Sequence, residues 1–228
     1  MQAMQIPIEW LPAQGRPEQL ILLLHGWCSH ALDMAPLAQR LRLEFPQAAV
    51  LAPDAPQVDD KGRRRQWYSI QDLSPETWPL RVQSVLPDLQ TWVQAQQQRL
   101  GVGPAATALG GFSQGAVLAL SLALNEDGIA GRVLAFGGHL PTVPTVAPRH
   151  TTLHFFHGED DTIFPAAAVR QRFEQLGELQ GDATIDIAQG IGHELHAVLI
   201  DCAIHRLRSH IPLRTWQAAL GAAQASCG

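Results

Sequence analysis

Short apolar runs alternate with longer amphipathic segments along most of the chain. The apolar runs predict strands at residues 20–24, 48–52, 107–109, 132–136, 152–156 and 184–188. Several of these runs are apolar at every position, which is typical of parallel strands that are buried on both faces. The segments between them predict helices at residues 32–43, 75–100, 116–124, 166–176 and 197–210. This alternation indicates an α/β fold with a mostly parallel central sheet and helices on both faces.

The longest predicted helix, residues 75–100, has a clear start signal and two interior prolines. Ser74 suits the N-cap position, and Pro75 suits the first turn. Pro79 and Pro87 lie further inside, so we expect them to kink the helix or to shorten it.

The composition predicts one main domain. No Pro-, Gly- or Ser-rich stretch and no block of charge divides the 228 residues, 46% of which are hydrophobic. A chain of this size and composition can bury a sizeable core. We therefore predict a single domain over residues 1–211. Residues 212–228 form a tail that can add one more helix around Trp216 and Leu220.

The overall charge argues against a polyanionic partner. The formal net charge is −5 and the isoelectric point is near 6.0. A protein with this balance is not expected to bind nucleic acid or an anionic membrane surface. The basic cluster at Lys61, Arg63, Arg64 and Arg65 is interpreted as a solvated loop. No apolar run approaches the length that crosses a membrane.

The cysteines and the N-terminal segment indicate a cytoplasmic protein. Cys28, Cys202 and Cys227 lack metal-ligand spacing, and any disulfide pairing would leave one of them over. That usage suits a reducing compartment. Residues 1–10 also lack the basic and apolar regions of a signal peptide.

The most informative motif is a glycine-flanked serine between a predicted strand and a predicted helix. It reads Gly111-Phe112-Ser113-Gln114-Gly115, and apolar runs at residues 105–109 and 116–124 flank it. Strand, G-x-S-x-G and helix in this order are the context of a nucleophile elbow. The turn is tight, so the glycines must lack side chains if strand and helix are to approach closely. The pattern predicts that Ser113 is the nucleophile of a serine hydrolase.

A serine hydroxyl needs a base to remove its proton and a carboxylate to orient that base. The loop after residues 152–156 carries Asp160 and Asp161, and the motif leaves both open as the acid. The loop after residues 184–188 ends in His193, which is favoured as the base over His196 on the following helix. The order serine, aspartate, histidine is that of the α/β-hydrolase fold. The two histidines are three apart, so they do not match the H-E-x-x-H metal spacing, and no metal is expected.

Two backbone N–H groups are needed to stabilise an oxyanion. One is expected from Gln114, directly after the nucleophile. The other is expected from Trp27, where Gly26 allows close approach of the backbone after the first core strand. His25 is interpreted as structural, and Cys28 as a buried small hydrophobic residue.

These residues resemble the phospholipase/carboxylesterase family of small α/β-hydrolases, which includes acyl-protein thioesterases and bacterial carboxylesterases. The matching pieces are Leu24-His25-Gly26, Ala52-Pro53, Trp67-Tyr68, Gly111-Phe112-Ser113-Gln114-Gly115-Ala116, His157-Gly158 with Asp161 and Pro165, and Gly192-His193. The resemblance implies that Asp161 is the acid and that esters or thioesters are hydrolysed through an acyl-enzyme without a cofactor. It also implies that Trp67, Tyr68 and Leu140 border the acyl site.

The chain departs from the family pattern at Cys28, Ser69 and Gly138-His139, which leaves the choice of substrate open. Residues 137–151 are too few, and too rich in proline, to bury a cap domain, so we expect an open cleft. The leading hypothesis is a carboxylesterase for small, short-to-medium acyl esters. The alternatives are a lysophospholipase or acyl-protein thioesterase, and a non-catalytic α/β-hydrolase that binds a partner. The sequence also leaves a homodimer open.

Overall fold

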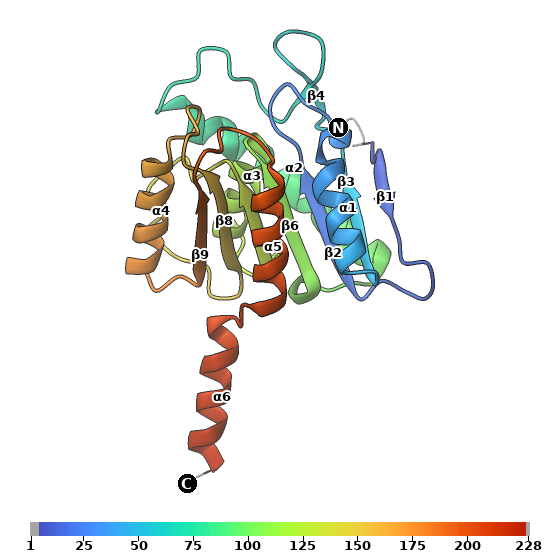
Figure 1. Cartoon of the computed structure of the whole chain (residues 1–228), viewed down its shortest axis with the longest axis vertical. Helices are drawn as coiled ribbons and strands as arrows, with labels where there is room; N and C mark the ends of the chain where they lie inside the picture. Colours follow the sequence, from blue (N-terminus) through green and yellow to red (C-terminus); the bar gives the residue numbers. More distant parts are fainter. Residues whose placement is uncertain (1–4, 227–228) are drawn as a thin grey trace.

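The computed structural model describes residues 5–226, and its centre is a seven-stranded sheet (Figure 1). The strands lie in the order β1-β3-β2-β6-β7-β8-β9. Their bounds are Ile8–Trp10 (β1), Gln19–Leu24 (β2), Ala48–Ala52 (β3), Thr107–Phe112 (β6), Arg132–Phe136 (β7), Thr152–Gly158 (β8) and Ala183–Ala188 (β9). Every neighbouring pair is parallel except β1 with β3. The carboxyl ends of the parallel strands therefore share one edge, which we call the carboxyl edge.

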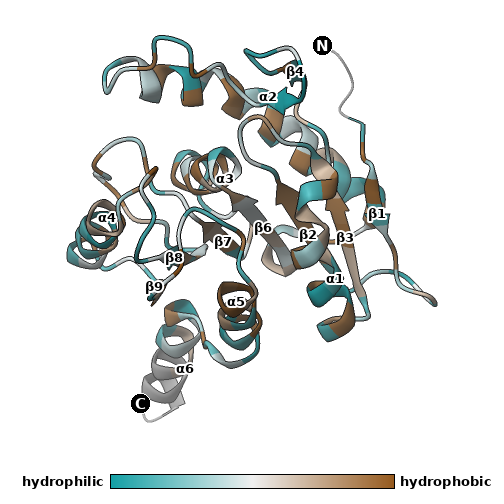
Figure 2. Cartoon of the chain, turned by 45° about the horizontal axis from the view of Figure 1, so that its top comes forward, coloured by the Kyte–Doolittle hydropathy of each residue, from teal (hydrophilic) through white to brown (hydrophobic). Residues whose placement is uncertain are grey.

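Helices cover both faces of the sheet. Their bounds are Ala35–Glu44 (α1), Thr77–Leu100 (α2), Gln114–Asn125 (α3), Ala166–Glu178 (α4) and Ala197–Ser209 (α5), with a 3₁₀ turn at Ala31–Met34 before α1. Leu20, Leu22 and Leu24 of β2 lie on the side of the sheet that α2, α3 and α4 cover, whereas Ile21 and Leu23 lie on the side that α1 and α5 cover. Alternate residues are thus buried on opposite faces, and Figure 2 shows apolar strands between amphipathic helices. The architecture is the α/β-hydrolase fold with a mostly parallel sheet.

Three short strands were not predicted from the sequence. Strand β1 has only three residues, and β4 (Gln57–Val58) and β5 (Arg65–Gln66) form a separate two-stranded hairpin. Strands of two or three residues are too short to show an alternating pattern.

Neither interior proline ends the second helix, so the expectation that they shorten it is wrong. Helix α2 begins at Thr77 and continues through both Pro79 and Pro87 to Leu100. Pro79 lies in the first turn, where the missing N–H has no intrahelical acceptor. Pro87 removes one interior hydrogen bond, and the burial of a leucine and valine stripe against α3 and the sheet offsets this cost of about 3 kcal/mol. The N-cap is Glu76 and not the predicted Ser74, whose Oγ accepts the N–H of Thr77 at 3.3 Å just before the helix.

The C-terminal helix α6 (Leu213–Ser226) projects from the edge of the sheet opposite the carboxyl edge (Figure 1). The N–H of Leu213 donates to Asp182 at 3.1 Å, and Arg214 donates to Thr152 Oγ1 at 3.1 Å, so the start of the helix is fastened to the sheet. Cys227 lies outside the described residues.

The connection between β7 and β8, residues 137–151, is described throughout and forms neither helix nor strand. No cap domain is therefore inserted at this point of the carboxyl edge. Among the helices of residues 5–226, none combines the length and the apolar character needed to cross a bilayer.

Candidate active site

Ser113 stands at the sharp turn between β6 and α3. Its backbone angles are φ 55° and ψ −117°, a conformation that a non-glycine residue rarely adopts. A Cβ on Gly111 would lie 2.3 Å from the backbone carbon of Gly115, and one on Gly115 would lie 2.1 Å from the carbonyl oxygen of Leu24. Both glycines are thus required by close approach, and the strain at Ser113 lifts its hydroxyl above the carboxyl edge.

Three loops that follow different strands bring Ser113, His193 and Asp161 together. The Nε2 atom of His193 lies 3.0 Å from Ser113 Oγ, and its Nδ1 atom lies 2.7 Å from Asp161 Oδ2. The carboxylate accepts a hydrogen bond from Nδ1–H, so the neutral imidazole carries its hydrogen there and leaves Nε2 free to accept from the serine. The Asp161 side chain is fully buried, whereas the His193 side chain is 19% exposed.

Of the two aspartates, Asp161 is the one that contacts His193. Besides His193, the Asp161 carboxylate accepts the N–H groups of Ile163 at 2.9 Å and Phe164 at 2.8 Å through Oδ1. Asp160 is exposed. His196 lies at the start of α5, where its Nδ1 accepts the N–H of Val198 at 3.2 Å. It caps that helix and does not contact the serine.

The expected oxyanion donors lie on the two sides of Ser113. Gln114 is the first residue of α3, so its N–H has no acceptor within the helix. This N–H lies at the positive end of the helix dipole. Trp27 follows Gly26, at which a Cβ would lie 3.3 Å from Ser113 Cβ. The turn after β2 therefore packs directly against the nucleophile.

The side chain of Gln114 has a role that the sequence did not reveal. Its Oε1 accepts the N–H of Trp67 at 2.9 Å, and its Nε2 donates to the carbonyl of Tyr68 at 2.7 Å. The Trp67 indole donates in turn to the carbonyl of His25 at 2.8 Å. One glutamine therefore ties the nucleophile helix to the aromatic loop, and that loop to the turn after β2. No local pattern signals such a long-range contact.

His25 is structural, as expected. Its Nε2 accepts the N–H of Ala55 at 3.0 Å and its Nδ1 donates to the carbonyl of Gly26 at 2.7 Å. Burial lowers the pKa of His25, so the ring is neutral and can make both bonds.

The three residues expected to border the acyl site are packed inside the protein. Trp67 is 1% exposed, Tyr68 is 4% exposed and Leu140 is 2% exposed. They expose little surface to a substrate, because their contacts with other side chains bury them. Burial also raises the pKa of Tyr68, whose hydroxyl accepts from the Trp78 indole at 3.1 Å.

Two partly exposed aromatic rings lie beside His193. The centroid of the His193 ring lies 4.8 Å from that of Phe112 and 5.8 Å from that of Phe164. Trp78, at the start of α2, lies 5.9 Å from Phe164. Phe164 and Trp78 carried no motif, so sequence reasoning missed them.

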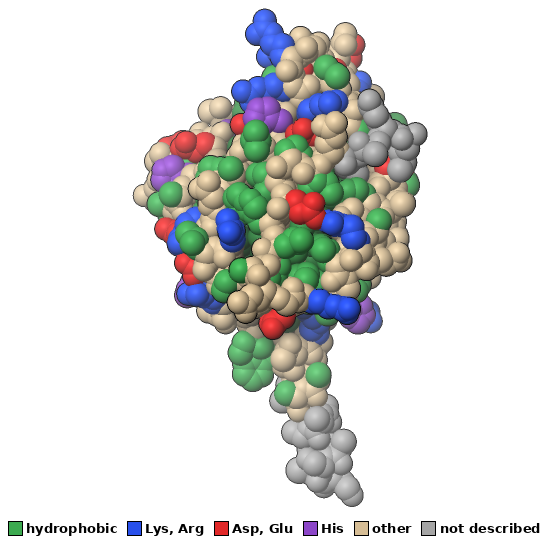
Figure 3. Space-filling model, turned by 90° about the vertical axis from the view of Figure 1, so that its right-hand side faces the viewer, with side chains coloured by type: hydrophobic (Ala, Val, Ile, Leu, Met, Phe, Trp, Pro, Cys, Tyr) green, Lys and Arg blue, Asp and Glu red, His purple; other side chains and the backbone are tan. Residues whose placement is uncertain are grey.

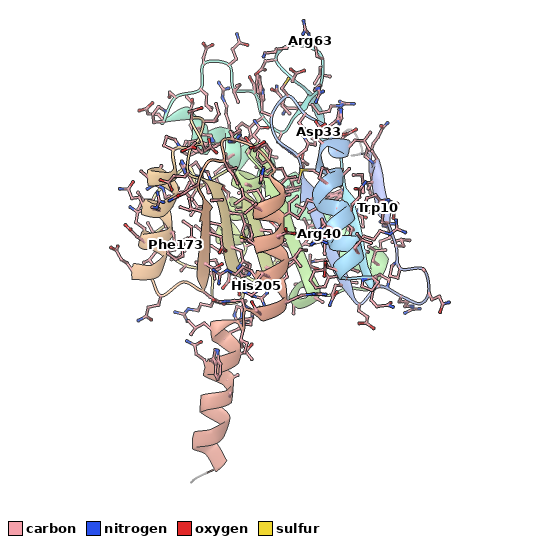
Figure 4. All side chains as sticks on the ribbon, in the orientation of Figure 1. Trp10, Asp33, Arg40, Arg63, Phe173 and His205 are labelled. Carbon is pink, nitrogen blue, oxygen red and sulfur yellow. The ribbon has the colours of Figure 1, made fainter. Side chains whose placement is uncertain are left out.

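The basic cluster lies on the β4–β5 hairpin above the carboxyl edge, where Lys and Arg side chains gather at the top of Figure 3. Arg64 pairs with Asp33 at 2.8 Å, and the Lys61 ammonium lies 4.9 Å from the Trp27 ring centroid. Arg63 stands at the outer tip and points away from the body (Figure 4). The cluster is therefore largely a solvated and paired loop.

Cys28 has a positive φ of 51°, a backbone conformation that favours glycine. Partial burial and the neighbouring Asp59 carboxylate raise the pKa of its thiol, which disfavours a reactive thiolate. Within the part of the chain that the structure describes, no group of three or more His, Cys, Asp or Glu side chains could hold a metal ion.

Comparison with known proteins agrees with this geometry. Residues 11–211 match the model of the phospholipase/carboxylesterase family. The chain is 34% identical over 203 residues to Esterase YpfH of Escherichia coli, with 89% of this chain and 88% of that protein covered. It is 27% identical over 206 residues to acyl-protein thioesterase 1 of Gibberella zeae, with 82% of this chain and 86% of that protein covered. The crystal structure of esterase PE8 superposes with a TM-score of 0.83 at 27% identity, covering 91% of this chain and 99% of that one. This chain therefore belongs to the phospholipase/carboxylesterase family of α/β-hydrolases.

Proposed function

We propose that this protein is a carboxylesterase that hydrolyses small, short-to-medium acyl esters through an acyl-enzyme on Ser113. The observation that carries the proposal is the hydrogen-bonded series from Ser113 through His193 to the buried Asp161, at 3.0 and 2.7 Å. Membership of the phospholipase/carboxylesterase family makes the chain a hydrolase that acts on esters.

In the first half of the reaction, Ser113 Oγ attacks the ester carbonyl carbon while its proton passes to Nε2 of His193. The carbonyl π electrons move to oxygen, and the N–H groups of Gln114 and Trp27 donate to the resulting oxyanion. Asp161 stabilises the imidazolium and fixes its orientation without taking the proton.

The tetrahedral intermediate then re-forms its carbonyl and breaks the bond to the alcohol, which leaves with the proton from His193 Nε2. Water attacks the acyl-enzyme with the same base, and the acid product leaves as the Ser113 hydroxyl is restored. These steps need no metal or organic cofactor, because side chains and backbone donors supply base, nucleophile and oxyanion stabilisation.

The preference for short-to-medium chains rests on the small apolar surface beside the triad. Phe164 and Trp78 are partly exposed, and Ile163 is 64% exposed, so these residues can cover an acyl chain only in part. Residues 137–151 form no cap to extend that cover. Each methylene that leaves water contributes about 0.8 kcal/mol, roughly fourfold in kcat/KM, only while protein remains to cover it.

A series of nitrophenyl esters from acetate to palmitate, each below its micelle-forming concentration, tests this preference. We expect kcat/KM to rise over the first members and then to level off or fall. A value that keeps rising to palmitate requires a long groove and favours the lysophospholipase or thioesterase hypothesis.

A thioesterase is the second candidate, because two of the relatives that match over most of their length are named acyl-protein thioesterase 1. The ratio of kcat/KM for an acyl-CoA thioester to that for the nitrophenyl ester of the same acyl chain separates the two. A protein that turns over neither class and does not react with a serine-directed probe would be a binding module.

We further propose a cytoplasmic location, since Cys28 and Cys202 are both free, as a reducing compartment permits. Fractionation of cells that produce the protein checks this directly.

A further inference from the structure

A second histidine lies against the acid of the triad. The Nε2 atom of His157, near the end of β8, lies 3.3 Å from Asp161 Oδ2 and 2.7 Å from the carbonyl oxygen of Phe164. His157 is 1% exposed. The family motif includes His157 but implies no role for it, and the reaction steps proposed above do not use it.

The two contacts determine where the His157 ring carries its proton. Both neighbours of Nε2 are acceptors, so Nε2 must be the protonated nitrogen. The other nitrogen, Nδ1, is buried and has no hydrogen-bond partner among the described residues. Protonating it would place an unsatisfied charged donor in the protein interior, so the ring is neutral.

The surroundings of His157 agree with a neutral ring. The titratable or charged groups that face it are Asp161, His193, His139 and Arg170, of which Asp161 alone favours a cation. Burial dominates, and it lowers the pKa of His157. A neutral ring can hold Asp161 in position and leave its negative charge in place. His193 needs that negative charge when it takes the proton from Ser113.

We propose that His157 is a positioning residue of the triad: its neutral Nε2–H donates to the Phe164 carbonyl and, from 3.3 Å, faces Asp161 Oδ2, which holds Asp161 and the loop to Phe164 in place. The inference rests on the proposed function, since it concerns the base that activates Ser113. Asp161 Oδ1 then accepts the N–H groups of Ile163 and Phe164, whereas Oδ2 accepts from His193 and lies 3.3 Å from His157 Nε2.

The test replaces the donor and then restores it. In His157→Phe, which keeps a ring but has no N–H, we expect kcat to fall about 10- to 100-fold because Asp161 is no longer held in register. The acid limb of kcat/KM should move about 0.5 to 1 unit to higher pH, since the carboxylate stabilises the imidazolium more strongly without the neighbouring Nε2–H. His157→Gln places an amide N–H within reach of the same acceptors and should restore both readouts to within a few-fold.

His154→Phe is the matched control, because His154 is also fully buried on β8 but bonds to Thr184 at 2.8 Å on the other face of the sheet. It should lower stability without moving the acid limb. An unchanged acid limb in His157→Phe, a glutamine variant as impaired as the phenylalanine variant, or the same shift in His154→Phe would overturn the proposal.

A measurement on the unaltered protein covers the case in which His157→Phe does not fold. In ¹⁵N-histidine NMR at neutral pH, His157 should be the neutral tautomer with its hydrogen on Nε2. A cationic ring or a hydrogen on Nδ1 would contradict the inference. Labelling of Ser113 in the same sample tests the proposed function separately, so the two can fail independently.

Discussion

The two edges of the central sheet each hold a histidine bonded to an aspartate, yet only one of the pairs faces a nucleophile. At the carboxyl edge, His193 lies 2.7 Å from Asp161. At the opposite edge, His210 lies 3.0 Å from Asp182. The two contacts are nearly alike in distance, so the pair by itself does not make an active site.

The difference lies in what the second nitrogen and the remaining oxygens contact. His193 offers Nε2 to Ser113, which a strained turn and the start of α3 hold above the sheet. Asp182 instead accepts the hydroxyl of Thr152 at 2.6 Å and the N–H of Leu213 at 3.1 Å, and so fastens α6 to the sheet. Parallel strands deliver their following loops to one edge only, which is why the chemistry gathers there.

Replacing each of the two aspartates with asparagine should distinguish the two pairs most clearly. Asp161→Asn removes the charge that orients His193 and stabilises its cation, so we expect kcat to fall about 10⁴-fold. Asp182→Asn should leave kcat near that of the parent and lower the melting temperature instead. Steady-state kinetics with a nitrophenyl ester and thermal unfolding of both variants give the two readouts.

Asp160→Asn supplies the neighbouring control, because Asp160 is exposed beside the triad acid. It should keep most of the activity. A large loss in Asp160→Asn together with a small one in Asp161→Asn would reverse the assignment of the acid.

Two buried glutamines allow the same comparison between the two edges, with smaller expected effects. Gln114→Ala frees the aromatic loop from the nucleophile helix and leaves the Trp67 N–H and the Tyr68 carbonyl unpaired, so we expect kcat to fall about 10- to 100-fold. Gln97 makes a similar double contact near the opposite edge, to Thr107 and to the carbonyl of Ile129.

Gln97→Ala should therefore lower stability by about 1–3 kcal/mol and leave kcat unchanged. Equal losses of kcat in the two glutamine variants, at a temperature where both are folded, would show that Gln114 acts through stability alone.

The sequence predicted the parts of the molecule that obey local rules. The main strands, the elbow at Ser113 and the histidine after the last strand each follow from a run of apolar residues or a glycine-flanked turn. The contacts of Gln114 and His157 were not foreseen, because they join segments far apart in the chain. The hairpin β4–β5 and the burial of Trp67 depend in the same way on tertiary packing.

The buried histidine at the edge opposite the triad predicts how stability depends on pH. Burial lowers the pKa of His154 to about 3 in the folded protein, whereas an unfolded histidine titrates near pH 6.5. Between these values the unfolded chain binds the extra proton, so stability is fully present above about pH 6.5 and falls as the pH drops. The loss from this group is about 1.4 kcal/mol per pH unit within that window.

Urea unfolding of the parent and of His154→Gln at pH 7, 6 and 5 measures this contribution. The difference in unfolding free energy between the two proteins should shrink as the pH falls, because only the parent carries the titrating ring. A difference that stays constant with pH would place the pKa of His154 near its ordinary value.

The smallest expected effect is that of metal removal. The proposed steps draw nucleophile, base and oxyanion donors from the chain itself. Prolonged chelation should therefore leave both kcat and kcat/KM unchanged. Activity that is lost on chelation and recovers with added zinc would contradict the mechanism.

The most direct test of the central claim is the reaction of the protein with a fluorophosphonate probe, which labels an activated serine. The account predicts rapid labelling of the parent at Ser113, slow labelling of His193→Ala and none of Ser113→Ala. Asp182→Asn, altered at the other edge, should label at the parent's rate. Undiminished labelling of Ser113→Ala would show that the nucleophile lies elsewhere.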